Sequence, residues 1–463
     1  MLSLQFMKTR LIITAILACA AQLGLAQISF SGNSKPVFED TPSKSTGLQK
    51  IYVLYDTNGV SMHYEASTDS KVTWYTYDEG GAAYANEIPG IERNGRETTL
   101  KDMTNYANKG IVIEEGIENT YVLWVVNYKD YYLRLHSLVI EDATDCGTAT
   151  LNVNGTGKDI GYYTITGAHQ VLDRQMKLSC QTLVWSDAKD MWAQVDTVEI
   201  ENTLKSTIVV PAPLCNTTFT LWGDRFLQFW DEDVEITSDT YMTSAVDVHT
   251  TAVQEERDND NEMKNEGGQF GGSAPVTIIF SSDCTDAVIH KEWQMSYDSE
   301  FSNLVLRLNQ DEVEQTFEEA GTFYWRFVGS NEDGTCEAIG ETYTVNIGES
   351  ELKCPNVFTP GTSEGANDIW KVSYKSIVEF HCWIFNTWGN QIIEFTDPSQ
   401  GWDGTYRGKL VKPGVYYYVI KAKGSDGKEY KLGGDINIIR YKENPYSNGD
   451  SDGGTVPDGG TTE

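Results

Sequence analysis

The residue types that could carry out catalysis or bind a metal are present in this chain, but they are scattered. None of the six histidines lies three to five residues from another histidine or from a cysteine: His63, His136, His169, His249, His290 and His381. Zinc sites need ligands at such spacings. Hydrolase, phosphate-loop and dinucleotide motifs are also missing from the sequence. We therefore predict a protein that is not an enzyme and that holds no cofactor.

Two acidic fragments have the alternating carboxylates of a calcium loop. The first, 258–262, lacks the glycine that turns such a loop, and the second, 448–453, has Gly459 where a bidentate acid is needed. Because the chain carries a formal charge of −33, neighbouring carboxylates are common in it. We interpret both fragments as solvated acidic loops.

Cysteine spacing favours an oxidising compartment. Cys284 and Cys336 lie at opposite ends of one strand-rich segment and are the first expected disulfide, worth about 4 kcal/mol on an entropic estimate. Cys354 and Cys382 are a second expected pair. The pairing of the remaining three stays open: Cys146, Cys180 and Cys215.

Charge is unevenly distributed along the chain. Residues 353–442 carry 12 Lys/Arg against 9 Asp/Glu, whereas residues 27–352 carry 21 against 54. Acidity of this size excludes nucleic acid as a partner. It is compatible with simple solubility, with a basic partner or with divalent cations.

The elements that would position these residues are strands. Apolar and polar residues alternate in short segments at roughly ten-residue spacing, joined by turns such as Asn58-Gly59 and Asp333-Gly334. The pattern predicts an all-β chain of tandem immunoglobulin-like β-sandwich domains at 49–141, 142–240 and 241–350. The segment Leu133–Val139 is expected to close the first domain. Residues 254–273 are expected to form an acidic loop without core residues.

The third of these domains has a more specific pattern. Ala320-Gly321-Thr322-Phe323-Tyr324-Trp325, followed by a Gly-Thr-Cys turn, resembles the closing strands of immunoglobulin-like or PKD-like surface modules. Such modules suggest a protein ligand or a surface glycan as partner. Aromatic strands could form a glycan-stacking platform, although the same Trp and Tyr residues also build sandwich cores.

The C-terminal ninety residues contain a series of turn motifs between aromatic strands. Gly and Asn or Asp between aromatic runs indicate tight turns, and Pro-Gly before a tyrosine run indicates the start of a strand. The motif positions are Pro355, Asn356, Phe358, Thr359, Pro360, Asn386, Trp388, Gly389, Asn390, Trp402, Asp403, Gly404, Gly408, Pro413, Gly414, Tyr416 and Arg440. We expect Trp388 and Trp402 to stabilise their turns by packing.

In this order the motifs resemble the gliding-motility-associated C-terminal domain, the type B sorting domain of type IX secretion cargo in Bacteroidetes. The resemblance implies a small β-sandwich sorting domain over 353–442 and an outer-membrane translocon or docking protein as partner. The chain departs from the family pattern at 360–368, where the usual acidic-glycine stretch is altered. Residues 443–463 follow the last family strand and are predicted to be a disordered acidic tail.

The N-terminal residues agree with export. Lys8 and Arg10 precede an apolar run that ends in Gly24-Leu25-Ala26, a small-x-small cleavage site. We predict a signal peptide over 1–26 and a linker over 27–48, and a protein secreted across the outer membrane to the cell surface or beyond.

The sequence thus predicts a non-enzymatic surface protein whose C-terminal domain serves sorting or docking and whose other domains serve interaction. One alternative is an accessory or regulatory component of the type IX secretion or gliding apparatus. Another is a glycan-binding or hydrolase-associated module.

Overall fold

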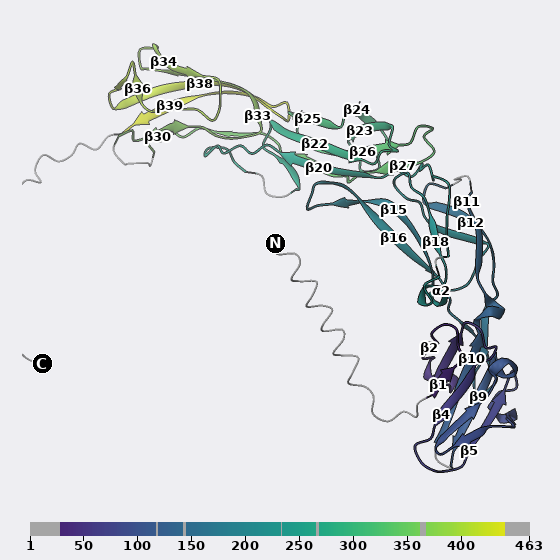
Figure 1. Ribbon diagram of the computed structural model, residues 1–463. Coiled ribbons are helices and arrows are strands. Elements are labelled where there is room, and N and C mark those ends of the chain that lie inside the picture. The colour runs from purple at the N-terminus through teal and green to yellow at the C-terminus, as the bar shows by residue number, and fades with distance from the viewer. Residues whose placement is uncertain are drawn as a thin grey trace, which may run out of the picture. The chain divides into compact units, whose positions relative to one another are not determined.

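A computed structural model of the chain describes residues 28–116, 119–141, 145–232, 234–264, 268–361 and 367–439. The predicted signal peptide, the tail 443–463, the fragment 448–453 and Arg440 lie outside these residues. The chain divides into two compact units, unit 1 (Met1–Ala245) and unit 2 (Val246–Glu463). Strands dominate both units (Figure 1). The all-β fold class that the alternating pattern predicted is therefore confirmed.

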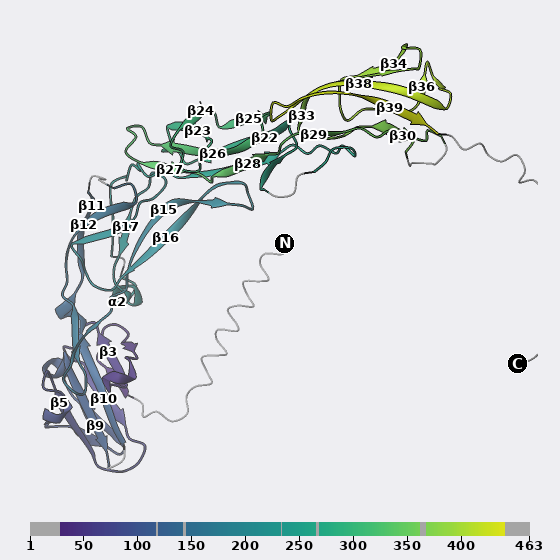
Figure 2. The same cartoon turned by 180° about the vertical axis from the view of Figure 1, so that it is seen from behind.

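Unit 1 begins with a β-sandwich of two sheets. One sheet has the order β1-β4-β8-β7 (Ile28–Ser31, Ser61–Glu65, Glu97–Leu100, Glu92–Asn94). The other has the order β2-β3-β10-β9-β5-β6 (Phe38–Asp40, Lys50–Leu54, Asn119–Asn127, Lys109–Glu115, Val72–Tyr77, Asn86–Glu87). Figure 2 shows β3, β10, β9 and β5 in one layer. Short 3₁₀ helices connect strands: η1 (Lys44–Thr46), η2 (Ala82–Tyr84), η3 (Met103–Tyr106) and η4 (Tyr128–Tyr131).

The segment 27–48, predicted to be a linker, is part of this sandwich. Strand β1 pairs with β4, and β2 pairs with β3. Ile28 and Phe30 alternate with serines and pack against the core between the sheets, so the segment has the period-two pattern of a strand. The linker prediction was wrong because the run is only four residues long and lacks a turn motif before it.

The second sandwich of unit 1 contains three sheets and one short helix. Its sheets have the orders β11-β12-β17 (Arg134–Ile140, Thr148–Thr156, Thr207–Pro211), β13-β14 (Ile160–Tyr163, His169–Leu172) and β16-β15-β18-β19 (Met191–Glu201, Met176–Ser186, Thr220–Trp222, Glu235–Thr237). Helix α2 spans Arg225–Phe229. Strand β11 pairs with β12, so Leu133–Val139 opens this sandwich and does not close the first one.

The third sandwich lies in unit 2. One sheet has the order β20-β22-β25 (Val248–Gln254, Val276–Cys284, Glu312–Phe317). The other has the order β21-β28-β26-β23-β24, with β27 paired to β26 (Phe270–Gly272, Tyr343–Ile347, Gly321–Ser330, His290–Ser296, Leu304–Leu308, Glu337–Ile339). Phe280 and Trp325 stack between the sheets with ring centroids 4.7 Å apart.

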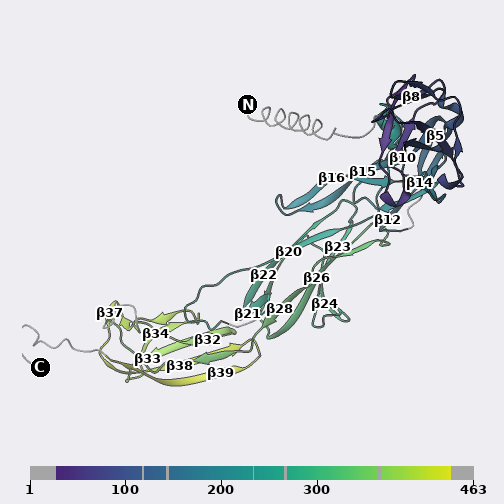
Figure 3. The same cartoon turned by 90° about the horizontal axis from the view of Figure 1, so that it is seen from below.

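The fourth sandwich completes unit 2. Its main sheet has the order β30-β39-β38-β33-β34 (Val357–Phe358, Glu429–Ile438, Gly414–Gly424, Ile377–Phe385, Gln391–Phe395). Figure 3 shows β33, β38 and β39 side by side. Short pairs complete the domain: β29 with β32 (Glu351–Lys353, Ser373–Lys375), β31 with β35 (Trp370–Lys371, Gly401–Trp402) and β36 with β37 (Thr405–Tyr406, Lys409–Leu410).

The acidic segment 254–273 contacts the fourth sandwich and is not simply a solvated loop. The amide of Asn261 donates to the carbonyls of Val372 and Pro398, both at 2.8 Å. Asp260 pairs with Lys371 at 2.7 Å. At the end of the segment, Phe270–Gly272 forms β21, which runs parallel to β28. The sequence pattern identified the charge of this segment but not the amide and carboxylate contacts that hold it in place.

Candidate functional site

A buried aromatic cluster forms the centre of the fourth sandwich. Trp402 is fully buried, and its ring centroid lies 5.4 Å from that of Phe358 and 5.1 Å from that of Tyr416. The indole N–H of Trp402 donates to the carbonyl of Thr405 at 2.9 Å. The carboxylate of Asp403 accepts from the backbone N–H and hydroxyl of the same Thr405. The Trp402 turn is therefore stabilised by packing, as predicted, and also by hydrogen bonds, which were not predicted.

Gly404 occupies a position in this turn that a side chain could not fill. Its φ is +74°, and a Cβ there would lie 2.8 Å from Cγ of Pro360 and 3.4 Å from Phe358. A positive φ and this close contact both favour glycine. Motif positions separated by more than forty residues thus meet around one turn.

The Trp388 turn differs from the Trp402 turn. Asn386 Oδ1 accepts from the backbone N–H groups of Trp388 and Asn390, both at 3.0 Å, and Gly389 has a φ of +78°. The Trp388 side chain is 86% exposed, so the expectation that it packs over its turn was wrong. The asparagine side chain, and not the indole, stabilises this turn.

The remaining motif positions shape the edges of the domain. The carbonyl of Asn356 accepts from Asn437 next to the parallel pair β30–β39, and the carbonyl of Pro355 accepts from the indole N–H of Trp370. Thr359 donates its N–H to the carbonyl of Asn367. Gly408 and Arg407 both have positive φ in the two-residue turn between β36 and β37. Pro413 and Gly414 stand at the start of β38.

Both predicted disulfides are corrected by the structure. Cys284 is free, whereas Cys336 and Cys146 are each disulfide-bonded. Cys284 ends β22 in the three-stranded sheet, and Cys336 lies in the turn before β27 on the opposite sheet, where its N–H donates to Asn331 Oδ1. Cys336 therefore forms its disulfide with a cysteine other than Cys284.

Cys354 and Cys382 are also free thiols. Burial raises the pKa of Cys354 despite a hydrogen bond between its side chain and that of Tyr418. Burial also raises the pKa of Cys382, to about 12. Neither thiol is therefore ionised at neutral pH, and both pack in the domain as small apolar groups.

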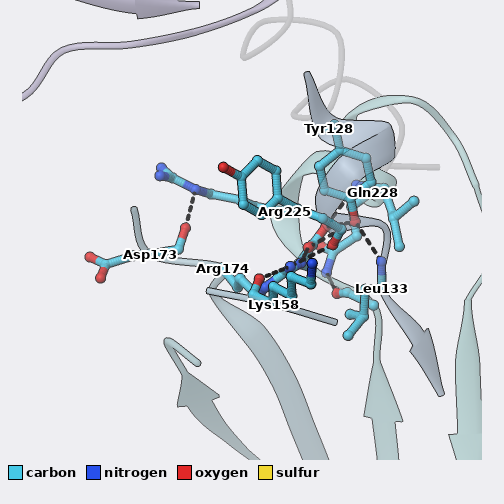
Figure 4. A network of polar contacts seen from close by, with 11 residues as sticks. Tyr128, Leu133, Lys158, Asp173, Arg174, Arg225 and Gln228 are labelled. Carbon is cyan, nitrogen blue, oxygen red and sulfur yellow. Dashed lines mark hydrogen bonds and ion pairs between the residues drawn. The ribbon is translucent and has the colours of Figure 1, made fainter. Parts of the chain in front are cut away.

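A buried ionic network connects the two sandwiches of unit 1 (Figure 4). Asp224 and Arg174 form an ion pair, and their side chains are 0% and 1% exposed. The hydroxyl of Tyr128, from η4, donates to both carboxylate oxygens of Asp224 at 3.0 and 2.9 Å. The same carboxylate accepts from the N–H of Leu227 and so caps helix α2.

The guanidinium of Arg174 extends the network to both sandwiches. Its Nη2 donates to the carbonyls of Tyr131 at 2.6 Å and Lys158 at 2.5 Å. Burial raises the pKa of Asp224, and the charge of Arg174 acts in the opposite direction. The carboxylate of Asp224 thus accepts hydrogen bonds from groups of both sandwiches, which is the arrangement of a structural joint.

Sequence reasoning missed this network. The one local indication was Asp224 directly before Arg225-Phe226-Leu227, an N-cap residue ahead of a helical turn. Nothing in the sequence shows that Tyr128 and Arg174 meet it, because they lie 96 and 50 residues away.

The candidate metal ligands do not converge within the described ranges. Those residues contain no group of three or more His, Cys, Asp or Glu side chains that could hold a metal ion. In the fragment 258–262, Asp260 pairs with Lys371 and Glu262 pairs with Arg257. In the described part of the chain, no helix is long and apolar enough to cross a membrane.

Two segments match known protein families. Residues 138–238, which run from the end of β11 to β19, match the fibronectin type III domain family. Residues 352–434, which include the Trp402 cluster, match the CHU_C type IX secretion signal domain. The chain therefore carries a secretion signal domain of this type and, in its middle region, a fibronectin-type sandwich.

Whole-chain comparisons add little to this result. The three N-terminal domains of the highly immunogenic outer capsid protein of bacteriophage RB49 align with 66% of this chain and 99% of their own, at 9% identity and a TM-score of 0.21. The eight N-terminal immunoglobulin domains of the Down syndrome cell adhesion molecule align with 89% of this chain and 57% of their own, at 10% identity and a TM-score of 0.17. No curated protein matches the chain.

Proposed function

We propose that this chain is a non-enzymatic surface protein that the type IX route exports across the outer membrane. Its fourth sandwich is the sorting and docking module, and its first three sandwiches are interaction modules for a protein or glycan ligand. The observation that carries the proposal is the match of 352–434 to a type IX secretion signal domain. The buried cluster of motif residues around Trp402 supports it, because the motif specifies one folded domain.

The interaction role rests on the character of the other domains. A fibronectin-type sandwich offers sheet faces and loops for binding. The most buried carboxylate of unit 1, Asp224, is occupied by Arg174, Tyr128 and a helix N-terminus, which favours a structural role over catalysis.

Surface proteolysis of intact cells tests the export route. In wild-type cells an added protease should degrade the protein, and in a strain lacking the type IX translocon the protein should be protected. A periplasmic marker protein, protected in both strains, controls for cell integrity. Equal sensitivity in the two strains would refute export by this route.

A further inference from the structure

The outer face of the main sheet in the fourth sandwich is apolar and exposed. Side chains that alternate with the buried residues of β33 and β38 point to this face, and the register places Trp383 opposite Val419 and Phe385 opposite Tyr417. Tyr417, Val419 and Val415 are 46%, 42% and 38% exposed. Adjacent exposed apolar side chains on one sheet face are typical of interaction sites.

Lysines border this apolar patch on one side. Lys421 of β38 lies directly opposite Lys431 of β39, and like charges in such a cross-strand pair destabilise a sheet. Lys431 pairs with Glu429 at 2.7 Å, and Lys423 lies 3.6 Å from Glu379. Among the described residues, Lys421 has no carboxylate partner, and its ammonium lies 6.0 Å from the ring centroid of Trp383.

The lysine side of the patch is hollowed. A cavity of about 430 Å³ has a lining that includes His381 and Trp383. Its charged lining residues are three lysines and two carboxylates: Lys421, Lys423, Lys431, Glu379 and Glu429. Because Glu379 and Glu429 pair with Lys423 and Lys431, the uncompensated charge is that of Lys421. The His381 ring stacks on Trp383 with centroids 3.7 Å apart, which restricts the orientation of the indole. A preorganised aromatic ring beside positively charged groups is suited to a partner that combines apolar groups with carboxylates.

Charge complementarity gives the chemistry of the partner. Residues 353–442 have an excess of three positive charges, whereas residues 27–352 have an excess of 33 negative charges. The lysine cluster is therefore a local exception in an acidic chain. Aromatic side chains dominate the centres of protein interfaces, and charges at the rim set specificity and association rate.

We propose that this face, defined by Trp383, Tyr417, Val419, Lys421 and Lys431, is the surface through which the secretion signal domain contacts its export partner. The partner is a protein whose contact surface is apolar and bordered by carboxylates. The inference rests on the proposed function and names the part of the domain that performs it.

The test compares two pairs of full-length variants in native cells. One face variant combines Tyr417→Thr with Val419→Thr, which places β-branched residues that favour strands at both positions, and the other is Lys421→Glu. The matched controls are Leu410→Thr and Lys409→Glu on β37, an exposed apolar residue and an exposed lysine of the same domain. Surface proteolysis measures the exported fraction, and thermal unfolding with light scattering of the purified chains measures folding and oligomeric state.

We expect both face variants to lower the exported fraction about tenfold, and the controls to match wild type. All four should unfold within about 3 °C of wild type. Normal export of the face variants would overturn the inference, and so would equal loss of export in the controls. A wild-type dimer that the face variants convert to monomer would also overturn it, because the face would then bind a second copy. If wild type itself reaches the surface without the translocon, the proposed function fails instead.

Discussion

The two units each join two sandwiches, and they do so with different chemistry. In unit 1 the joint is the Asp224–Arg174–Tyr128 network, and one continuous hydrophobic cluster runs from Leu48 to Tyr241 through both sandwiches. In unit 2 the buried hydrogen bonds of the joint involve neutral groups such as Ser376 and Ser425, the Asp260–Lys371 pair lies at the surface, and each sandwich keeps its own core cluster.

This difference indicates how independently the sandwiches fold. The first sandwich has a core of its own between its two sheets, and its larger sheet also contributes to the cluster that it shares with the second sandwich. The second sandwich has only this shared cluster, so its core is incomplete without the first. The secretion signal domain in unit 2 has a separate core around Trp402, so it depends less on the sandwich that precedes it. Substitutions at the two joints should therefore differ in how much unfolding free energy they remove and in how many sandwiches show faster hydrogen exchange.

The largest effect should follow Asp224→Ala. The substitution leaves the buried guanidinium of Arg174 without its counter-ion and removes the cap of α2, so we expect a loss of roughly 4–6 kcal/mol of unfolding free energy. Hydrogen exchange should increase in peptides from both sandwiches of unit 1 and stay unchanged in unit 2.

A double substitution provides the control for this prediction. Arg174→Met with Asp224→Leu removes both charges and keeps apolar volume, so it should cost less than Asp224→Ala alone. If the double variant is as unstable as the single one, the network acts through shape or through Tyr128 and not through an unpaired charge.

The next largest effect should follow Trp402→Ala. Removing a fully buried indole costs about 3–5 kcal/mol, and faster exchange should be confined to the secretion signal domain. The unfolded domain should then block export and leave the protein in the periplasm. Lys409→Ala, at an exposed position, should change stability by less than about 0.5 kcal/mol. Normal export of Trp402→Ala with retention of Lys409→Ala would show that recognition depends on charge and not on packing.

Much of the fold could be predicted because its information is local. Alternating apolar residues and Asn-Gly or Asp-Gly turns specify strands within a few residues, and the motif around Trp402 combines packing with turn hydrogen bonds in one short segment. Predictions were wrong where the partner lies far away in sequence. We predicted that Cys284 and Cys336 pair because they bound one strand-rich segment, but Cys284 is free and Cys336 is bonded to a different cysteine.

The same reason explains what sequence analysis missed in the candidate sites. Trp388 and Trp402 stand in similar Trp-Gly and Trp-Asp-Gly contexts, yet one is exposed and the other is buried, because only Trp402 faces Phe358 and Tyr416. The exposed face around Tyr417 depends on the register of β38 with its neighbours β33 and β39. The alternation of tyrosines on β38 does not by itself define that register.

A smaller effect is expected for Ser376→Ala in the joint of unit 2. The hydroxyl of Ser376 accepts from the N–H of Ala274 at 3.2 Å, and its loss leaves a buried donor unsatisfied at a cost of about 1–3 kcal/mol. Exchange should increase near Ala274 while peptides around Trp402 keep their protection. Equal loss of protection around Trp402 would show that the two cores of unit 2 are coupled as strongly as those of unit 1.

The smallest effect concerns pH and Glu115 in the first sandwich. Burial alone would raise the pKa of Glu115, but hydrogen bonds from Ser67, Tyr64 and Thr68 together lower it from 4.5 to about 2. The folded pKa lies below the unfolded one, so ionised Glu115 stabilises the fold above about pH 4.5, and this contribution is lost as the pH falls toward 2.

Lowering the pH from 7 to 4 should therefore reduce the unfolding free energy of wild type more than that of Glu115→Gln, which has no charge to protonate. The difference between the two proteins should be at most about 1 kcal/mol. Urea unfolding of the full chain at both pH values, followed by exchange in peptides around Tyr64, measures the difference. Because the contacts of Glu115 lie within one sandwich, its titration should leave the Asp224 joint and all of unit 2 unaffected. An equal pH effect in Glu115→Gln would assign the acid sensitivity of unit 1 to other carboxylates.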